Sequence, residues 1–139
     1  MIDIQVLINK VALDTGYTVN LAKSREPNLQ DFPILPIIFI GYAEITSKYP
    51  QSALEATLFN THGEDLVQTF DIQIISDIEH FRTYWITIYK SLIGWNPIGS
   101  EQYHTGFTYK QGMVMGIDNA RQWHLDRWAI GFATTQVEF

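Results

Sequence analysis

Histidine and carboxylate side chains are the residues of this sequence best suited to catalysis or metal binding. No histidine lies three or four residues from another, so no helix face carries two imidazole ligands. The four histidines are His62, His80, His104 and His124. His62 lies near Glu64 and Asp65, which together offer three ligands, but polar residues at this density are typical of a solvated turn. We therefore expect no metal site.

His124 and Asp126 form the pair whose spacing best suits catalysis. Residues two apart on a strand share a face, and a histidine next to a carboxylate can activate a nucleophile. The sequence has no Gly-x-Ser-x-Gly motif that would supply that nucleophile. We interpret the pair as a surface contact, and a small hydrolase using it stays a weaker alternative.

Two further features bear on ligand binding. Gly112–Gly116 has two glycines four residues apart, but no Lys-Ser or Lys-Thr follows, so it predicts no phosphate-binding loop. Cysteine is absent, which excludes a thiolate nucleophile and a cysteine-ligated metal. Neither the two glycines nor the cysteine content indicates a cofactor.

A group of cations and aromatic rings near the end of the chain could hold a nucleic acid. Arg121 and Arg127 alternate with Trp123 and Trp128, and rings beside cations are how single strands are bound. Arginines at the edge of a core, with their stems along apolar surface, give the same pattern. We favour the core edge and keep a nucleic-acid module as an alternative.

Composition places limits on both partners and size. The 139 residues suit one domain spanning 1–139, with 133–139 expected to fray. Hydrophobic residues are 46% and aromatic residues 14%, whereas charged residues are only 17%, which is low against an average of about 25%. The net charge of -6 argues against a phosphate-backbone binder and against docking on anionic lipid. The most apolar run, Ile34–Tyr42, is too short to span a membrane, so we expect no membrane partner.

Hydrophobic periodicity predicts the elements of the first half. Ile4, Leu7, Ile8 and Val11 form one helical stripe, which Asp3 can begin and Gly16 can end. Tyr17–Leu21 alternates and reads as a short strand, followed by a proline-punctuated loop over Lys23–Pro36. Ile37–Tyr42 is apolar at both parities, which predicts a strand covered on both faces.

The middle of the chain predicts a hairpin and then a long helix. Leu54–Asn60 and Val67–Ile75 read as paired strands joined by the polar turn Thr61–Asp65. Ser76 and Glu79 match a capping box, which predicts a helix over Asp77–Ile93.

Strands are expected after this helix, and the whole reads as an α+β domain. Thr105–Tyr109 and Gly112–Ile117 suggest two short strands, and Gln122–Phe132 a final one. We therefore predict a mostly antiparallel sheet with two helices packed on it. The predicted core is Leu7, Ile8, Val11, Ile38, Ile40, Leu58, Phe70, Ile72, Ile74, Phe81, Trp85, Ile88, Leu92, Trp95 and Trp128.

The end of the long helix carries a recognisable motif. Leu92–Pro97 reads L-x-G-W-x-P, and the chain closes with the aromatic strand Arg127–Phe132. This order of elements and this motif resemble the small tail terminator (tail completion) proteins of long-tailed bacteriophages. The resemblance implies that Gly94 ends the helix, Trp95 fills the seam between helix and sheet, and Pro97 fixes the exit of the chain.

The same resemblance implies a structural, non-enzymatic role in the virion. Such a protein forms a ring, commonly a hexamer, that caps the tail tube and presents a docking surface to the head–tail connector. An acidic ring would give the channel a negative wall along which DNA slides without specific binding. Another head–tail connector or completion protein is the nearest alternative. The residues we expect at subunit or tube contacts are Tyr84, Tyr89, His62, Glu64 and Asp65.

Overall fold

Five strands in the order β1-β2-β3-β5-β4 form one sheet in the computed structural model, which describes residues 2–47, 65–97 and 106–133. β1 runs parallel to β2, and every other neighbouring pair is antiparallel. In chain order the elements are α1 (Ile4–Thr15), β1 (Thr18–Leu21), the 3-10 turn η1 (Leu29–Asp31), β2 (Ile37–Ser47), β3 (Asp65–Asp77), α3 (Phe81–Leu92), β4 (Thr108–Asp118) and β5 (Arg121–Ala133). The predicted α+β fold with two helices and a mostly antiparallel sheet is confirmed.

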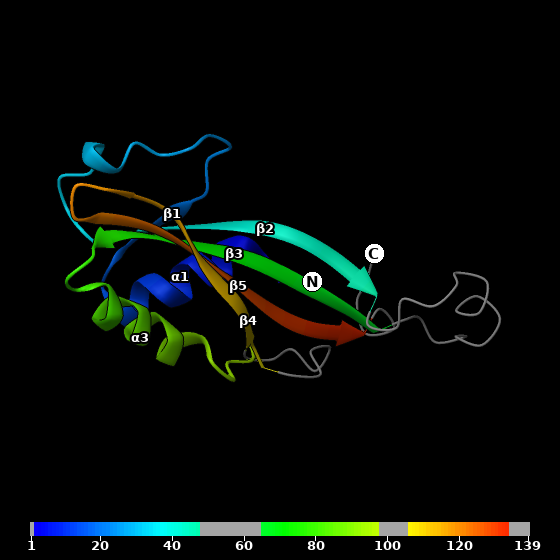
Figure 1. Cartoon of the computed structure of the whole chain (residues 1–139). Coiled ribbons are helices and arrows are strands. Elements are labelled where there is room, and N and C mark those ends of the chain that lie inside the picture. Colours follow the sequence, from blue (N-terminus) through cyan, green and yellow to red (C-terminus); the bar gives the residue numbers. More distant parts are fainter. Residues whose placement is uncertain (1, 48–64, 98–105, 134–139) are drawn as a thin grey trace.

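The two helices cover the same face of the sheet, and the loop with η1 covers part of the other (Figure 1). Because strand residues alternate between faces, Phe70, Ile72 and Ile74 of β3 all point toward the helices. They meet buried residues of both helices, for example Leu7 from α1 and Leu92 from α3. Burial of this apolar surface is the main force that holds the layers together.

Most of the predicted core lies where the sequence placed it. The fully or nearly fully buried members are Leu7, Ile8, Val11, Ile38, Ile40, Phe70, Ile72, Ile74, Ile88, Leu92 and Trp128. Phe81, Trp85 and Trp95 are half-buried and pack against this cluster. Leu58 lies outside the described residues.

The first helix forms as its local signals predict. The Asp3 carboxylate accepts a hydrogen bond from the Gln5 backbone N–H at 2.8 Å, which satisfies one of the free donors at the start of α1. Gly16 ends the helix with a φ of 73°, and its N–H donates to the Ala12 carbonyl. The predicted strand after it is also confirmed as β1.

The predicted capping box at Ser76 is wrong. β3 continues through Asp77, because Ser76 and Asp77 are paired with Gln122 and Arg121 of β5. The helix therefore begins only at Phe81. The Asp77 carboxylate instead accepts the backbone N–H of His80 at 3.0 Å, so the strand ladder takes precedence over a local helix signal.

The predicted hairpin of Leu54–Asn60 with Val67–Ile75 is also wrong. A strand has two edges, and β3 uses one for β2 and the other for β5. No edge of Val67–Ile75 is left for a further strand. Residues 54–60 and the turn residues 61–64 lie outside the described residues.

The two short strands predicted after the helix are one strand, β4. Its register with β5 shifts between Tyr109 and Gln111 and again between Val114 and Gly116, so a bulge bends the strand without ending it. A two-residue turn then leads into β5, with φ values of 46° at Asn119 and 64° at Ala120. Positive φ at both positions matches the twist of a tight hairpin. The predicted last strand, Gln122–Phe132, is confirmed within β5, and residues 134–139 lie outside the description.

The proline-punctuated loop folds back over the outer face of the sheet. Leu29 packs on Phe39 and Ile75 there, so Ile37–Ile40 is covered on both faces. The predicted cover on both faces of Ile37–Tyr42 is wrong at Tyr42, which is 53% exposed. The Arg121 guanidinium donates to the carbonyls of Leu29 and Phe32, each at 2.8 Å, and so ties the loop to β5. Neither helix among the described residues is long and apolar enough to cross a bilayer.

Candidate functional site

The Leu92–Pro97 motif is built as a seam between α3 and the start of β4. Leu92 is fully buried, and Gly94 lies just beyond the helix with a φ of 73°. The Gly94 N–H donates to the Phe107 carbonyl at 2.9 Å, and the Phe107 N–H donates to the Trp95 carbonyl at 2.8 Å. The Trp95 and Phe107 rings stack with centroids 5.5 Å apart and planes inclined by 6°. The helix end is thereby fastened to the sheet.

Close backbone approach at this seam requires a second glycine. A Cβ on Gly106 would lie 2.1 Å from the Gly94 carbonyl oxygen, which is too close for any side chain. On its other side the seam reaches α1, because the Lys10 ammonium lies 5.4 Å from the centre of the Trp95 ring. The motif thus joins both helices to the sheet.

The two tyrosines expected at contacts lie mostly within the domain. Tyr84 is half-buried and meets Tyr17 edge-on at 5.5 Å, and burial, followed by the Asp77 charge, raises its pKa. Tyr89 stacks on Trp85 at 5.1 Å and contacts the Trp128 ring at 5.5 Å. Their role in contacts between subunits stays a prediction. His62, Glu64 and the side chain of Asp65 lie outside the described residues.

The prediction that His124 and Asp126 form a surface pair is wrong. The His124 Nε2 and Asp126 Oδ1 atoms are hydrogen-bonded at 2.7 Å. The His124 side chain is only 12% exposed and the Asp126 side chain only 2%. Side chains of β5 alternate between the two faces of the sheet, so His124 and Asp126 point to the same face as the buried Trp128. This face lies beneath α3, and the centre of its Phe81 ring is 4.7 Å from the centre of the His124 ring.

A third side chain, which the sequence gave no signal to find, completes this buried polar cluster. The Tyr109 hydroxyl donates to the Asp126 carboxylate at 3.1 Å, across the pairing of β4 with β5. Burial, and then the nearby Asp126 charge, raises the pKa of Tyr109 to about 12. We call Tyr109, His124 and Asp126 the buried triad, in which Asp126 is buried and the other two residues are half-buried.

The buried triad has no space for a substrate on its polar atoms. A Cβ on Gly112 would lie 2.3 Å from the Tyr109 hydroxyl and 2.4 Å from an Asp126 carboxylate oxygen. The backbone of β4 therefore fills the place that a reacting molecule would need. Within the described part of the chain, no serine or threonine hydroxyl is hydrogen-bonded to His124 either. The geometry gives the hydrolase alternative no support.

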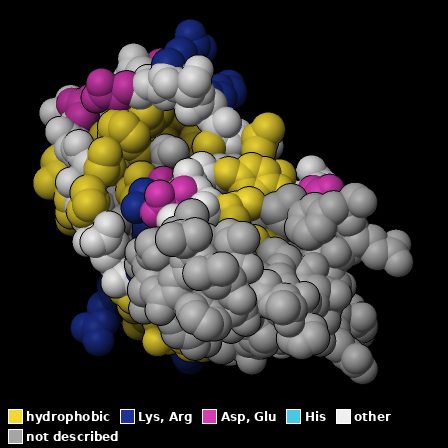
Figure 2. All heavy atoms as spheres, turned by 90° about the vertical axis from the view of Figure 1, so that its right-hand side faces the viewer, with side chains coloured by type: hydrophobic (Ala, Val, Ile, Leu, Met, Phe, Trp, Pro, Cys, Tyr) yellow, Lys and Arg dark blue, Asp and Glu magenta, His cyan; other side chains and the backbone are white. Residues whose placement is uncertain are grey.

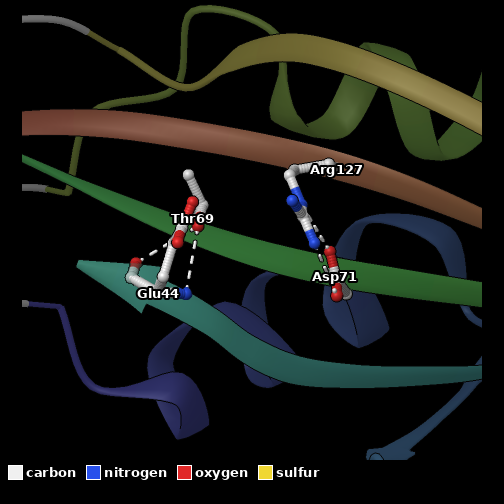
Figure 3. A network of polar contacts seen from close by, with 4 residues as sticks. All are labelled: Glu44, Thr69, Asp71 and Arg127. Atoms are coloured by element: carbon white, nitrogen blue, oxygen red, sulfur yellow. Dashed lines mark hydrogen bonds and ion pairs between the residues drawn. The ribbon is translucent and has the colours of Figure 1, made fainter. Parts of the chain in front are cut away.

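The two arginines proposed for nucleic acid already have partners. Arg121 holds the loop carbonyls described above, and Arg127 donates to the Asp71 carboxylate at 3.0 and 3.4 Å. That hydrogen bond, with the Asp71 charge, raises the pKa of Arg127. Figure 3 shows this pair joining β3 to β5, beside the Thr69 hydroxyl, which bonds the Glu44 backbone and so joins β3 to β2. These cations stabilise the outer face of the sheet.

The two tryptophans of the same group lie on opposite faces of the sheet. Trp128 is 1% exposed on the helix side. Trp123 packs under the proline-punctuated loop on the outer side, where its indole N–H donates to Gln73 at 2.9 Å. The four residues do not form one basic, aromatic patch, so the nucleic-acid alternative loses the surface it needs.

Asp77, Glu79 and His80 bring possible metal ligands together at the β3–α3 turn. Their nearest ligand atoms all lie within 4.8 Å of one another. Burial alone would raise the pKa of Asp77, but hydrogen bonds from the His80 side chain and backbone hold it below its usual value. Since these bonds already serve the start of α3, Asp77 and His80 have a structural explanation.

A hollow of about 380 Å³ lies between the loop and the outer face of the sheet. Phe39 and Gln73 line it from the sheet, and Phe32, Lys23 and Arg25 line it from the loop. Figure 2 shows hydrophobic side chains gathered in a hollow, with acidic and basic side chains at its margin. Charges of both signs at the margin define no single class of ligand.

Four exposed apolar residues lie on β4, an edge strand that sequence reasoning did not single out. Met113, Val114, Met115 and Ile117 are 46%, 52%, 41% and 63% exposed. β4 is the last strand of the sheet, so one side of its backbone has no strand beside it among the described residues. The signal was present, because no charged residue occurs between Lys110 and Asp118.

Comparison with known proteins adds no relative. No protein-family model matches this sequence, and no curated protein matches it.

Proposed function

We propose that the protein is a structural subunit of a long-tailed phage, a tail terminator that forms a ring, commonly of six copies, on the end of the tail tube. In this role it stops tube growth and offers a docking surface to the head–tail connector. It belongs to the virion, at the head-proximal end of the tail, and uses no cofactor and no substrate.

The observation that carries the proposal is the seam at Leu92–Pro97. The segment that bears the family resemblance is also the one that fastens α3 to the sheet, through Gly94, Trp95 and Phe107. A motif with a structural task of this kind is expected to persist in proteins that share a fold. It therefore supports a relation in fold with the terminator proteins.

The placement of polar residues also favours a structural role. The strongest candidates for chemistry are engaged in the architecture: Asp126 and His124 in the buried triad, and Arg127 with Asp71. The apolar edge of β4 is a surface for another protein and not for a small polar substrate. The net charge of -6 per copy suits a channel through which DNA passes without binding.

Tube capping can be tested with the purified protein and tubes polymerised from the tail tube protein of the same phage. If the protein is added during polymerisation, we expect shorter tubes whose length falls as its concentration rises. Negative-stain electron microscopy should then show extra density at one end of each tube. An unrelated acidic protein of similar size serves as the control.

Two results would contradict the proposal. Tubes of unchanged length with bare ends would show that the protein does not cap them. Protein bound to the portal of DNA-filled heads, and absent from tubes, would instead assign it to the head-completion proteins, which are the nearest alternative.

A further inference from the structure

The Tyr109 ring lies within a group of touching aromatic rings. Its centre is 5.7 Å from that of Trp85, 6.0 Å from that of Tyr89 and 5.4 Å from that of Trp128. Trp85 in turn stacks on Tyr89 at 5.1 Å, and both of these residues are only half-buried. Rings at such separations are in van der Waals contact, and single electrons pass between them without any molecule entering the core. The group therefore connects Tyr109 with the surface of the protein.

The Tyr109 hydroxyl has a proton acceptor at hydrogen-bond distance, which a phenol needs when it loses an electron. An oxidised phenol is a strong acid, and it gives up its O–H proton to a base that lies within hydrogen-bond reach. The Asp126 carboxylate accepts this hydrogen bond at 3.1 Å, and the Asp126 side chain is only 2% exposed. The same carboxylate oxygen accepts from Nε2 of His124, so we assign a hydrogen to Nε2, which cannot then take the proton. Asp126 is the group that receives it.

Trp128 provides a comparison within the same group of rings. Its indole N–H is buried and has no hydrogen-bond partner among the residues that the structure describes. An oxidised indole there would keep its proton and remain a cation in an apolar layer, which is costly. Tyr109 forms a neutral radical instead, because the positive charge leaves as a proton to Asp126. Of these two rings, Tyr109 is therefore the one on which the loss of an electron is stabilised.

We propose that Tyr109 is a redox-active tyrosine, oxidised by one electron with Asp126 as its proton acceptor. The oxidant is a one-electron acceptor in solution, a radical or a metal complex, that meets the exposed parts of Trp85 or Tyr89. The oxidant gains one electron, Tyr109 loses one, and the hydroxyl proton moves along its hydrogen bond to Asp126. A one-electron donor such as a thiolate then returns the electron and becomes a thiyl radical, and Asp126 returns the proton.

This redox site needs no room for a substrate, which separates it from the hydrolase alternative. The backbone of β4 at Gly112 closes the polar atoms of the buried triad to a reacting molecule. An electron that crosses ring contacts, and a proton that shifts along one hydrogen bond, need no such access. The proposal is also independent of tube capping, and either can hold without the other.

Flash photolysis of the whole chain tests the proposal. The oxidant is ruthenium(III) tris-bipyridine, produced by a laser pulse with a cobalt(III) ammine as the sacrificial acceptor, and transient absorption distinguishes a neutral tyrosyl radical from tryptophan radicals. We expect the wild type to form tyrosyl radical, and Tyr109→Phe to lose that signal and keep tryptophan radicals. Tyr42→Phe is the matched control and should behave as the wild type, because the Tyr42 hydroxyl donates to a backbone carbonyl. An unchanged tyrosyl signal in Tyr109→Phe would overturn the proposal.

The proton transfer is tested separately from the electron transfer. The tyrosyl radical should form more slowly in heavy water, because the O–H bond breaks as the electron leaves. Asp126→Asn keeps the shape of the side chain but removes the base, so the tyrosyl signal should be lost while tryptophan radicals persist. Circular dichroism checks that this variant folds, and the isotope effect is measured on the wild type.

Two results would contradict this proton transfer and overturn the proposal. The first is an equal rate of radical formation in light and heavy water. The second is an undiminished tyrosyl signal in folded Asp126→Asn. Tube capping by a protein that gives these results would still support the proposed function.

Discussion

Gly112 is the residue at which β4 comes closest to the buried triad of Tyr109, His124 and Asp126. The absence of a Cβ there lets the backbone lie against the Tyr109 hydroxyl and the Asp126 carboxylate. A buried carboxylate is costly unless it is hydrogen-bonded, and Asp126 accepts from both partners. Packing at this one glycine therefore maintains a polar network inside an apolar layer.

Gly112→Ala should destabilise the protein by about 1–3 kcal/mol, because the added methyl group overlaps the triad. The measurement is the free energy of unfolding in urea. Gly116→Ala is a matched control on the same strand, since its Cβ would meet only the Trp123 ring, at 3.7 Å. Equal stability of the two variants would contradict the close packing described at Gly112.

Tyr109 should make the protein sensitive to strong base. Its pKa is raised from 10.0 to about 12 in the folded protein, mainly by burial. Between these values the unfolded chain has lost a proton that the fold still holds, so this contribution to stability is present below pH 10 and is lost as the pH rises toward about 12.

Tyr109→Phe tests this pH dependence, because it removes the titrating hydroxyl. Stability measured from pH 9 to about 12 should fall less steeply in the variant than in the wild type. Absorbance at alkaline pH should also lose one tyrosine that ionises near pH 12. A tyrosine at position 109 that titrates near 10 would contradict the burial described here.

At the scale of elements, the sequence predicted the structures that neighbouring residues determine, such as helix α1 and its ends. The stripe on α1, with Asp3 and Gly16 at its ends, is set within one stretch of chain and was predicted in full. The capping box at Ser76 failed because pairing with β5, nearly fifty residues later, extends β3 through it. The hairpin assigned to Val67–Ile75 failed for the same reason, since sequence periodicity does not reveal which strand lies beside which.

The candidate site shows the same division. The pairing of His124 with Asp126 follows from strand alternation and was foreseen, but their burial was not. Tyr109 joins them only because β4 pairs with β5 in one register. A sequence pattern cannot show which helix will cover a face, so the pair was placed at the surface.

The end of α3 offers a prediction at this scale. Gly94→Ala should cost about 1 kcal/mol, because a φ of 73° is unfavourable for a residue with a Cβ. Gly94→Asn should lose less, since asparagine tolerates this conformation better. Thermal unfolding followed by circular dichroism checks the order of the three proteins. Alanine and asparagine variants of equal stability would contradict the left-handed backbone conformation described at Gly94.

At the scale of the whole molecule, the domain has one well-packed face and two open surface features. The helices cover one face of the sheet. The β4 edge and the hollow between the loop and the outer face are exposed. A charge of -6 repeated around a ring would surround a channel with negative potential. These properties would suit the assembly role that we propose.

The symmetry and position of this protein in the intact virion test the central claim most directly. Cryo-electron microscopy of whole phage particles should show it as a closed ring between the tail tube and the head–tail connector, coaxial with the DNA channel. A particle in which that position is filled by another protein, with this chain absent, would contradict the account.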